Sequence, residues 1–183
     1  DGRDYHTLAE VCDYGARVAG SVGVMMAVLM GVKDHATLAR AADLGVAMQL
    51  TNICRDVGED ARAGRLYLPR DMMRAAGIDP DAFLHNPTPS AELTHVLKRV
   101  LAEAQRRYEL ADEGIRQLPR SCRPGILAAR RLYAEIGQTV VKNGYDSISR
   151  RAVVSRARKG QILFGLARGP AAAPELMAEP CAA

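Results

Sequence analysis

Residues 45–69 of this 183-residue chain read GVAMQLTNICRDVGEDARAGRLYLP, and their spacing predicts a helix. The apolar residues Leu50, Ile53 and Val57 pack on one part of its surface. At about 100° per residue, four polar side chains share an arc of about 80°. They are Gln49, Asn52, Asp56 and Asp60. Because the apolar side chains pack elsewhere, this polar stripe faces either water or a polar ligand.

Helices are also expected around this stretch. No proline occurs in residues 1–68, and the β-branched runs that mark strands are absent. We predict one helix over residues 7–30 and a second over residues 36–62, with a turn at 31–34 between them. Asp34 is a suitable cap for the second helix. Small residues within 19–23 predict that the first helix approaches a neighbouring backbone closely.

Prolines shape the rest of the chain. Their cluster in residues 69–89 predicts loop with short helical pieces. From Ser90, a candidate cap, apolar residues keep three-to-four spacing as far as Leu118, which predicts a long amphipathic helix. Pro119 ends that helix and Pro124 can open the next.

Two further helices fit before residue 169, with a break near Gly144. The Ala- and Pro-rich residues 170–183 are expected to be a disordered tail. The sequence therefore predicts an all-α fold, a single-domain helical bundle over residues 1–169.

The amino-acid composition and the distribution of charge argue against several classes of function. Aromatic residues make up only 4% of the chain, which leaves little for the stacking platforms of single-strand nucleic-acid binders, so we expect no nucleic-acid partner. The longest uncharged stretch, between Arg17 and Lys33, is shorter than the roughly 20 residues that span a bilayer. No secretion signal is present, which favours a cytoplasmic protein. The four cysteines lack metal or redox spacing, and we expect reduced, packed thiols.

Asp56 and Asp60 lie one helical turn apart. Such a carboxylate pair can hold a hard divalent cation, and Mg²⁺ is the expected ion because proteins typically bind it with one or two carboxylates plus substrate phosphates. Nearby Arg55, Arg62 and Arg65 add guanidinium groups that match phosphate oxygens. A solvated helix face with arginine partners would show the same pattern, so the pair alone leaves both interpretations open.

The residues that surround this aspartate pair in the sequence resemble a known family motif. The spacing of Gln49, Asn52, Arg55-Asp56, Asp60 and the Gly-Arg-x-Tyr-x-Pro run at 64–69 resembles the second aspartate-rich motif of the squalene and phytoene synthases. A second motif of that family, a tyrosine before Val-Ala-Gly-x-Val-Gly, is similar to Tyr14 and residues 18–23. The similarity runs from residue 1 to about residue 168, and the run RDVGEDARAGRLYLP looks most like bacterial phytoene synthases.

The resemblance implies a helical bundle of the isoprenoid synthase type and roles for individual residues. It implies Tyr14 as a catalytic residue that hydrogen-bonds the leaving group, and Tyr133 as a pocket-lining residue. The implied ligands of Mg²⁺, or of Mn²⁺ in its place, are Asp56, Asp60 and Asn52, with Glu59 assisting. The implied diphosphate-binding residues are Arg55, Arg65, Gln49 and Asn52.

The implied reaction is the head-to-head condensation of two geranylgeranyl diphosphates. It proceeds through a cyclopropylcarbinyl diphosphate to phytoene, releases diphosphate and belongs to carotenoid biosynthesis. Squalene, hydroxysqualene and dehydrosqualene synthases, which use farnesyl diphosphate, share much of the motif and stay as alternatives. A non-catalytic helical scaffold of the same fold is a further alternative.

The family's first aspartate-rich motif has no counterpart in this sequence. We therefore expect this chain to be an N-terminally truncated part of a longer enzyme, with negligible activity on its own. Helices that pack on this chain in a longer protein would leave apolar surface exposed here.

Six cations between Ser147 and Gly169 have no acid among them. They are Arg150, Arg151, Arg156, Arg158, Lys159 and Arg168. A solvated face is the usual explanation. Because prenyl substrates and products partition into bilayers, peripheral attachment to anionic lipid on the inner face of the membrane is a second interpretation. The histidines form no metal-binding pair, and the sequence assigns no oligomeric state.

Overall fold

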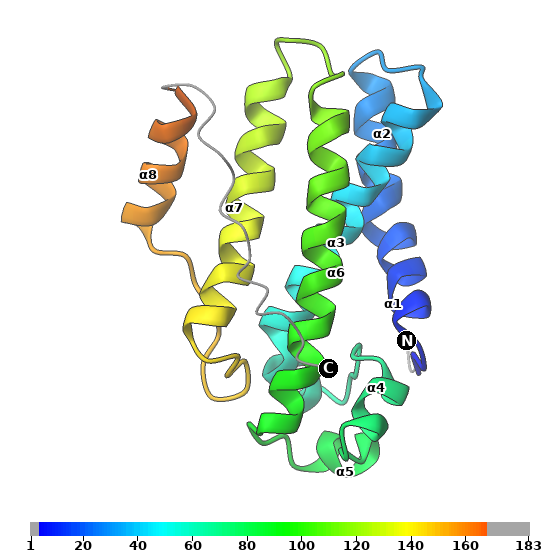
Figure 1. Cartoon of the computed structure of the whole chain (residues 1–183), viewed down its shortest axis with the longest axis vertical. Helices are drawn as coiled ribbons and strands as arrows, with labels where there is room; N and C mark the ends of the chain where they lie inside the picture. Colours follow the sequence, from blue (N-terminus) through cyan, green and yellow to red (C-terminus); the bar gives the residue numbers. More distant parts are fainter. Residues whose placement is uncertain (1–3, 168–183) are drawn as a thin grey trace, which may run out of the picture.

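The computed structural model describes residues 4–167, which contain helices and no strand. In Figure 1 the long helices lie side by side, with α6 in front of α3, α7 on one side and the N-terminal helices on the other. The all-α bundle expected from the sequence is confirmed. Its helices are α1 (Leu8–Gly15), the π-helical turn η1 (Ala16–Gly20), α2 (Ser21–Leu29), α3 (His35–Arg62), α4 (Arg70–Ala75), α5 (Pro80–His85), α6 (Ala91–Ile115), α7 (Arg123–Lys142) and α8 (Arg156–Ala167).

The N-terminal helix departs from the single α-helix expected over residues 7–30. It begins at Leu8, next to the predicted start, and Thr7 is its cap: the Thr7 hydroxyl accepts a hydrogen bond from the Glu10 N–H at 3.2 Å. The π-helical turn η1 then separates α1 from α2. Just beyond it, the Ser21 hydroxyl donates to the Arg17 carbonyl at 2.6 Å.

Glycines bring this N-terminal helix directly against α3. A Cβ atom added to Gly45 would lie 2.4 Å from the carbonyl oxygen of Ala19. A Cβ atom added to Gly23 would lie 2.4 Å from the carbonyl oxygen of Ala41. Because no side chain fits in these gaps, the two backbones touch, which confirms the close approach predicted from the small residues in 19–23.

The central helix α3 and the long helix α6 form most of the core. Each begins at its predicted cap: Asp34 accepts a hydrogen bond from the Thr37 N–H at 2.8 Å, and Ser90 accepts one from the Leu93 N–H at 3.0 Å. The predicted apolar face of α6 is buried almost completely. It comprises Leu93, Val96, Leu97, Val100, Leu101, Ala104, Tyr108 and Ala111.

Residues 143–155 connect α7 to α8 and cross α3 on the way; we call them the strap. The Gly58 N–H donates to the Ser147 carbonyl at 3.0 Å, and the Arg62 guanidinium donates to the Ile148 carbonyl at 2.6 Å. A Cβ atom on Gly58 would lie 2.8 Å from the Ile148 backbone. A glycine is therefore required where the strap crosses the aspartate-bearing helix.

Other sequence expectations have mixed outcomes. Cys12 and Cys54 are buried as expected, whereas Cys122 is partly exposed. The cationic run is not simply a solvated face, because Arg151 and Arg158 form ion pairs with acids of α3 and α7. Arg168, Cys181 and the expected tail at 170–183 lie outside the described residues. Over residues 4–167, every helix is too short or too polar to cross a bilayer.

Candidate active site

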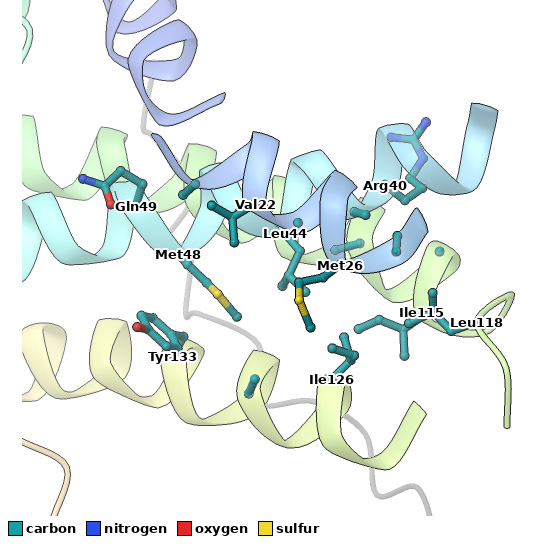
Figure 2. A pocket seen from close by; sticks show the side chains of 18 of the residues that line it. Val22, Met26, Arg40, Leu44, Met48, Gln49, Ile115, Leu118, Ile126 and Tyr133 are labelled. Carbon is teal, nitrogen blue, oxygen red and sulfur yellow. The ribbon is translucent and has the colours of Figure 1, made fainter. Parts of the chain in front are cut away.

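A pocket of about 340 Å³ lies between α2, α3, α7 and the C-terminal end of α6 (Figure 2). Figure 2 shows Met26, Met48 and Ile126 pointing toward one another across it. Most of the lining side chains are apolar, among them Val22, Met26, Leu44, Met48, Ile115, Leu118 and Ile126. A pocket of this kind suits a hydrocarbon chain.

One end of this pocket is polar. Gln49, Asn52 and Tyr133 belong to its lining, and Figure 2 shows Gln49 and the Tyr133 hydroxyl at the same end. The Oδ1 atom of Asn52 is buried and has no hydrogen-bond partner within residues 4–167. An unpartnered buried amide oxygen is energetically unfavourable. A cation or a hydrogen-bond donor that binds this atom would remove that cost.

Asp56 and Asp60 follow on the next two turns of α3, about 6 Å and about 12 Å beyond Asn52 along the helix axis. Neither lines the apolar pocket. Neither side chain is splayed into bulk solvent, since they are 17% and 19% exposed. The two carboxylates therefore lie beyond the polar end of the pocket, on the same helix as Gln49.

Arginines neutralise both aspartates. Asp56 accepts hydrogen bonds from the Nε atoms of Arg55 and Arg151, each at 2.8 Å. Asp60 accepts two from Arg65, at 3.0 and 3.2 Å. The residues expected to bind diphosphate, Arg55 and Arg65, thus contact the carboxylates in this structure.

The two carboxyl groups differ in how firmly they hold their charge. Burial by itself would raise the pKa of Asp56, but the hydrogen bonds from Arg55 and Arg151 bring it below the ordinary value. Burial raises the pKa of Asp60 despite the hydrogen bond from Arg65, and repulsion from Asp56 adds to the increase. Asp56 is therefore the more strongly ionised of the pair.

Tyr14 lies near Asp60 rather than in the lining of the pocket. Its ring centroid is 5.3 Å from that of Tyr67 and 5.2 Å from that of Tyr5. Burial raises the pKa of Tyr14 to about 12, and a hydrogen bond with Tyr67 and the charge of Asp60 contribute further. Tyr14 is thus a neutral phenol at physiological pH, able to donate a hydrogen bond to an anion.

The donor atoms on this face of α3, from Asn52 at the pocket to Asp56 and Asp60 beyond it, fit a divalent cation such as Mg²⁺ or Mn²⁺. Two mostly buried carboxylates, Asp56 and Asp60, and the unpartnered amide oxygen of Asn52 form an all-oxygen set. The arginine contacts show that the carboxylates already stabilise positive charge. No group of three His, Cys, Asp or Glu residues within 4–167 could hold a metal ion, so substrate and water would supply the other ligands.

Two members of this site were not predicted from the sequence. Arg151 reaches Asp56 from the strap, and the run of cations without acids after Ser147 was a sign that its partners come from elsewhere. Tyr67 belongs to the motif at 64–69, but its stacking on Tyr14 brings together residues from two separate elements.

Three acids and three arginines therefore adjoin an apolar pocket. This arrangement suits an amphipathic anion, with its hydrocarbon chain in the pocket and its charged group beside the arginines. The acids are Asp56, Glu59 and Asp60, and the arginines are Arg55, Arg65 and Arg151.

Comparison with known proteins identifies relatives of this chain. The family model for squalene/phytoene synthase matches residues 1–158. The chain is 56% identical over 159 residues to the phytoene synthase of Rhodobacter capsulatus and 52% identical over 158 residues to that of Cereibacter sphaeroides. These matches cover 87% and 86% of this chain but 47% and 44% of the relatives. The chain thus spans about half the length of the curated relatives it matches.

Solved structures share the fold. A dehydrosqualene synthase crystallised in complex with a ligand superposes with a TM-score of 0.76 at 30% identity, over 91% of this chain and 58% of that one. The crystal structure of YisP from Bacillus subtilis, at 24% identity, superposes with a TM-score of 0.80. Because the family model matches most of the sequence, the chain belongs to the squalene/phytoene synthase family.

Proposed function

We propose that this chain forms part of a prenyltransferase that condenses two geranylgeranyl diphosphates head to head into phytoene, for carotenoid biosynthesis. One observation carries the proposal: the apolar pocket ends on the same face of α3 that continues into Asp56 and Asp60. The bacterial relatives with 56% and 52% identity are phytoene synthases, which supports this product over the other head-to-head products.

Each part of the site has a role in this proposal. Bound at Asp56 and Asp60, Mg²⁺ would neutralise diphosphate charge and so favour ionisation of the allylic carbon–oxygen bond. Arg55 and Arg65 donate hydrogen bonds to the diphosphate, and the neutral Tyr14 phenol donates to the leaving group. In the longer enzyme, the apolar pocket walls would exclude water from the carbocation.

The reaction needs no redox cofactor. The first condensation releases one diphosphate and one proton and gives a cyclopropylcarbinyl diphosphate. Ionisation of that intermediate releases the second diphosphate, and rearrangement with loss of a proton gives phytoene. Squalene formation would require a reductant, and the sequence contains no GxGxxG dinucleotide-binding fingerprint.

Product analysis tests this assignment. An enzyme that contains this chain and the additional length found in its relatives is incubated with Mg²⁺ and either geranylgeranyl or farnesyl diphosphate, and the products are separated by chromatography. We expect phytoene from the C20 substrate. Preferential use of the C15 substrate would instead support a squalene-type or dehydrosqualene-type synthase, and absence of product from both would support a non-catalytic scaffold.

The 183 residues alone are proposed to have negligible activity. Several large apolar side chains of α2 face outward, and Leu29 is 81% exposed. The pocket wall formed by Val22 and Met26 is also partly exposed, so water would reach a carbocation inside. The same chromatographic assay, run on the chain alone beside the longer enzyme, checks this: equal turnover by the two would contradict it.

Peripheral attachment to the inner face of the membrane is a second proposal. Helix α8 exposes Leu163 and Phe164 and carries the cations Arg156 and Lys159, which matches the chemistry of an anionic lipid surface. We expect co-sedimentation with phosphatidylglycerol vesicles at low salt, weakened at high salt and by Arg156→Gln with Lys159→Gln. Vesicles of phosphatidylcholine alone are the control, and failure to bind anionic vesicles at either salt concentration would rule the attachment out.

A further inference from the structure

Arg151 is an unexpected neighbour of the aspartate pair. Its Nε atom donates a hydrogen bond to Oδ1 of Asp56 at 2.8 Å and lies 3.5 Å from Oε2 of Glu59. The contact joins residues 95 positions apart in the sequence. The arginine side chain itself is 46% exposed, whereas Asp56 is largely buried. A partly solvated cation is thus hydrogen-bonded to an atom that the proposed function assigns to a metal ion.

The strap holds Arg151 in this position. On one side of it, the backbone of residues 147–148 is hydrogen-bonded to Gly58 and Arg62. On the other side, Ala152 and Val154 are buried. Farther along, Arg158 makes two hydrogen bonds of 2.9 Å to Glu135, whose side chain is only 3% exposed. With these anchors on both sides, the strap delivers the Arg151 guanidinium to one place.

Charge neutrality explains why this contact matters for a cation. Three carboxylates face three guanidinium groups, so the cluster is balanced without a metal ion. A divalent cation that binds Oδ1 of Asp56 has to displace a hydrogen-bonded guanidinium and also adds two positive charges beside the others. Both effects weaken binding of the cation by itself.

We propose that Arg151 is a resident counter-ion of Asp56 that competes with the divalent cation and sets the metal affinity of the substrate-free site. The inference rests on the proposed function for the identity of the cation. The strap, by holding Arg151 at Asp56, thus lowers the affinity of the site for the metal ion. When a cation binds, Arg151 leaves Asp56 and the strap loses one of its ties to α3.

Titration with Mn²⁺ alone tests the competition, with free Mn²⁺ measured by electron paramagnetic resonance and no substrate present. We expect Arg151→Gln to tighten Mn²⁺ binding by about fivefold, the effect expected for loss of a competing, partly exposed ion pair. Arg150→Gln, which removes the same charge from the adjacent exposed position, should change the dissociation constant less than about twofold. Asp56→Asn should abolish the binding in either background.

Three results would overturn the proposal: unchanged affinity in Arg151→Gln, equal tightening by Arg150→Gln, or absence of saturable Mn²⁺ binding. Amide hydrogen exchange gives a second measurement that needs no variant. Added Mn²⁺ should speed exchange of the strap in the unmodified protein, and unchanged exchange at saturating Mn²⁺ would also contradict the inference. Prenyl turnover is measured separately, so loss of the proposed function and loss of this inference are distinguishable.

Discussion

Replacing Asp56 with asparagine in the longer enzyme is expected to lower product formation by about 10²- to 10³-fold, the effect of removing one well-placed electrostatic group from an active site. The physical reason is specific to this carboxylate. Asp56 has a lowered pKa and is held by two arginines, so it keeps its negative charge at neutral pH. Asparagine preserves the shape of the side chain but cannot neutralise a cation. Release of diphosphate with Mg²⁺ present is the measurement.

A matched control separates this effect from a general loss of charge. Asp13→Asn removes an exposed carboxylate that pairs with Arg17 on the N-terminal helix, and it should leave turnover within about twofold of the parent. Circular dichroism should show unchanged helical content in both variants. If Asp56→Asn retains more than half of the parent activity, the aspartate pair does not act in the reaction.

Gly45→Ala is expected to have the largest effect on stability, a loss of about 3 kcal/mol or more in the free energy of unfolding. The added methyl group would lie 2.4 Å from the Ala19 carbonyl oxygen and 2.6 Å from the Gly20 nitrogen. These are backbone atoms, which cannot rotate away as a side chain can. The substitution therefore has to push α3 away from η1, and chemical denaturation measures the resulting loss.

Gly125→Ala provides the opposite case. This glycine lies in the first turn of α7, and a Cβ atom there would meet nothing within 4 Å. Alanine should leave stability unchanged or raise it by up to about 1 kcal/mol, since it restricts the unfolded chain. If Gly45→Ala and Gly125→Ala were equally stable, the close η1–α3 contact would not contribute to the stability of the fold.

Local signals were enough to predict most of the fold. Asp34 and Ser90 cap their helices because each is a short polar side chain immediately before an apolar repeat, and the prolines limit where helices can run. The π-helical turn η1 was not predictable in this way, since it does not alter the composition of the segment. This turn lies directly against α3, in contact with residues more than twenty positions away in the sequence.

The candidate active site was also predictable only where local sequence signals determine it. Gln49, Asn52, Asp56 and Asp60 share one helix, so their common face follows from helical periodicity alone. Arg151 arrives from a segment with irregular backbone, where no period relates sequence to direction. Its partner could be found only from the tertiary path of the strap, which depends on the absence of a side chain at Gly58.

The π-helical turn makes the N-terminal helix sensitive to any change in its length. Closing a turn with one residue more than an α-turn rotates everything after Gly20 by about 100° relative to an uninterrupted helix. Tyr14, before the turn, thereby faces the acidic end, while Val22 and Met26, after it, face the hydrocarbon pocket. Deleting one residue from 16–20 would restore ordinary pitch and turn one of these two surfaces away from its target. The number of residues in the turn therefore keeps both halves of this helix in alignment, in addition to the glycines that let the helix touch α3.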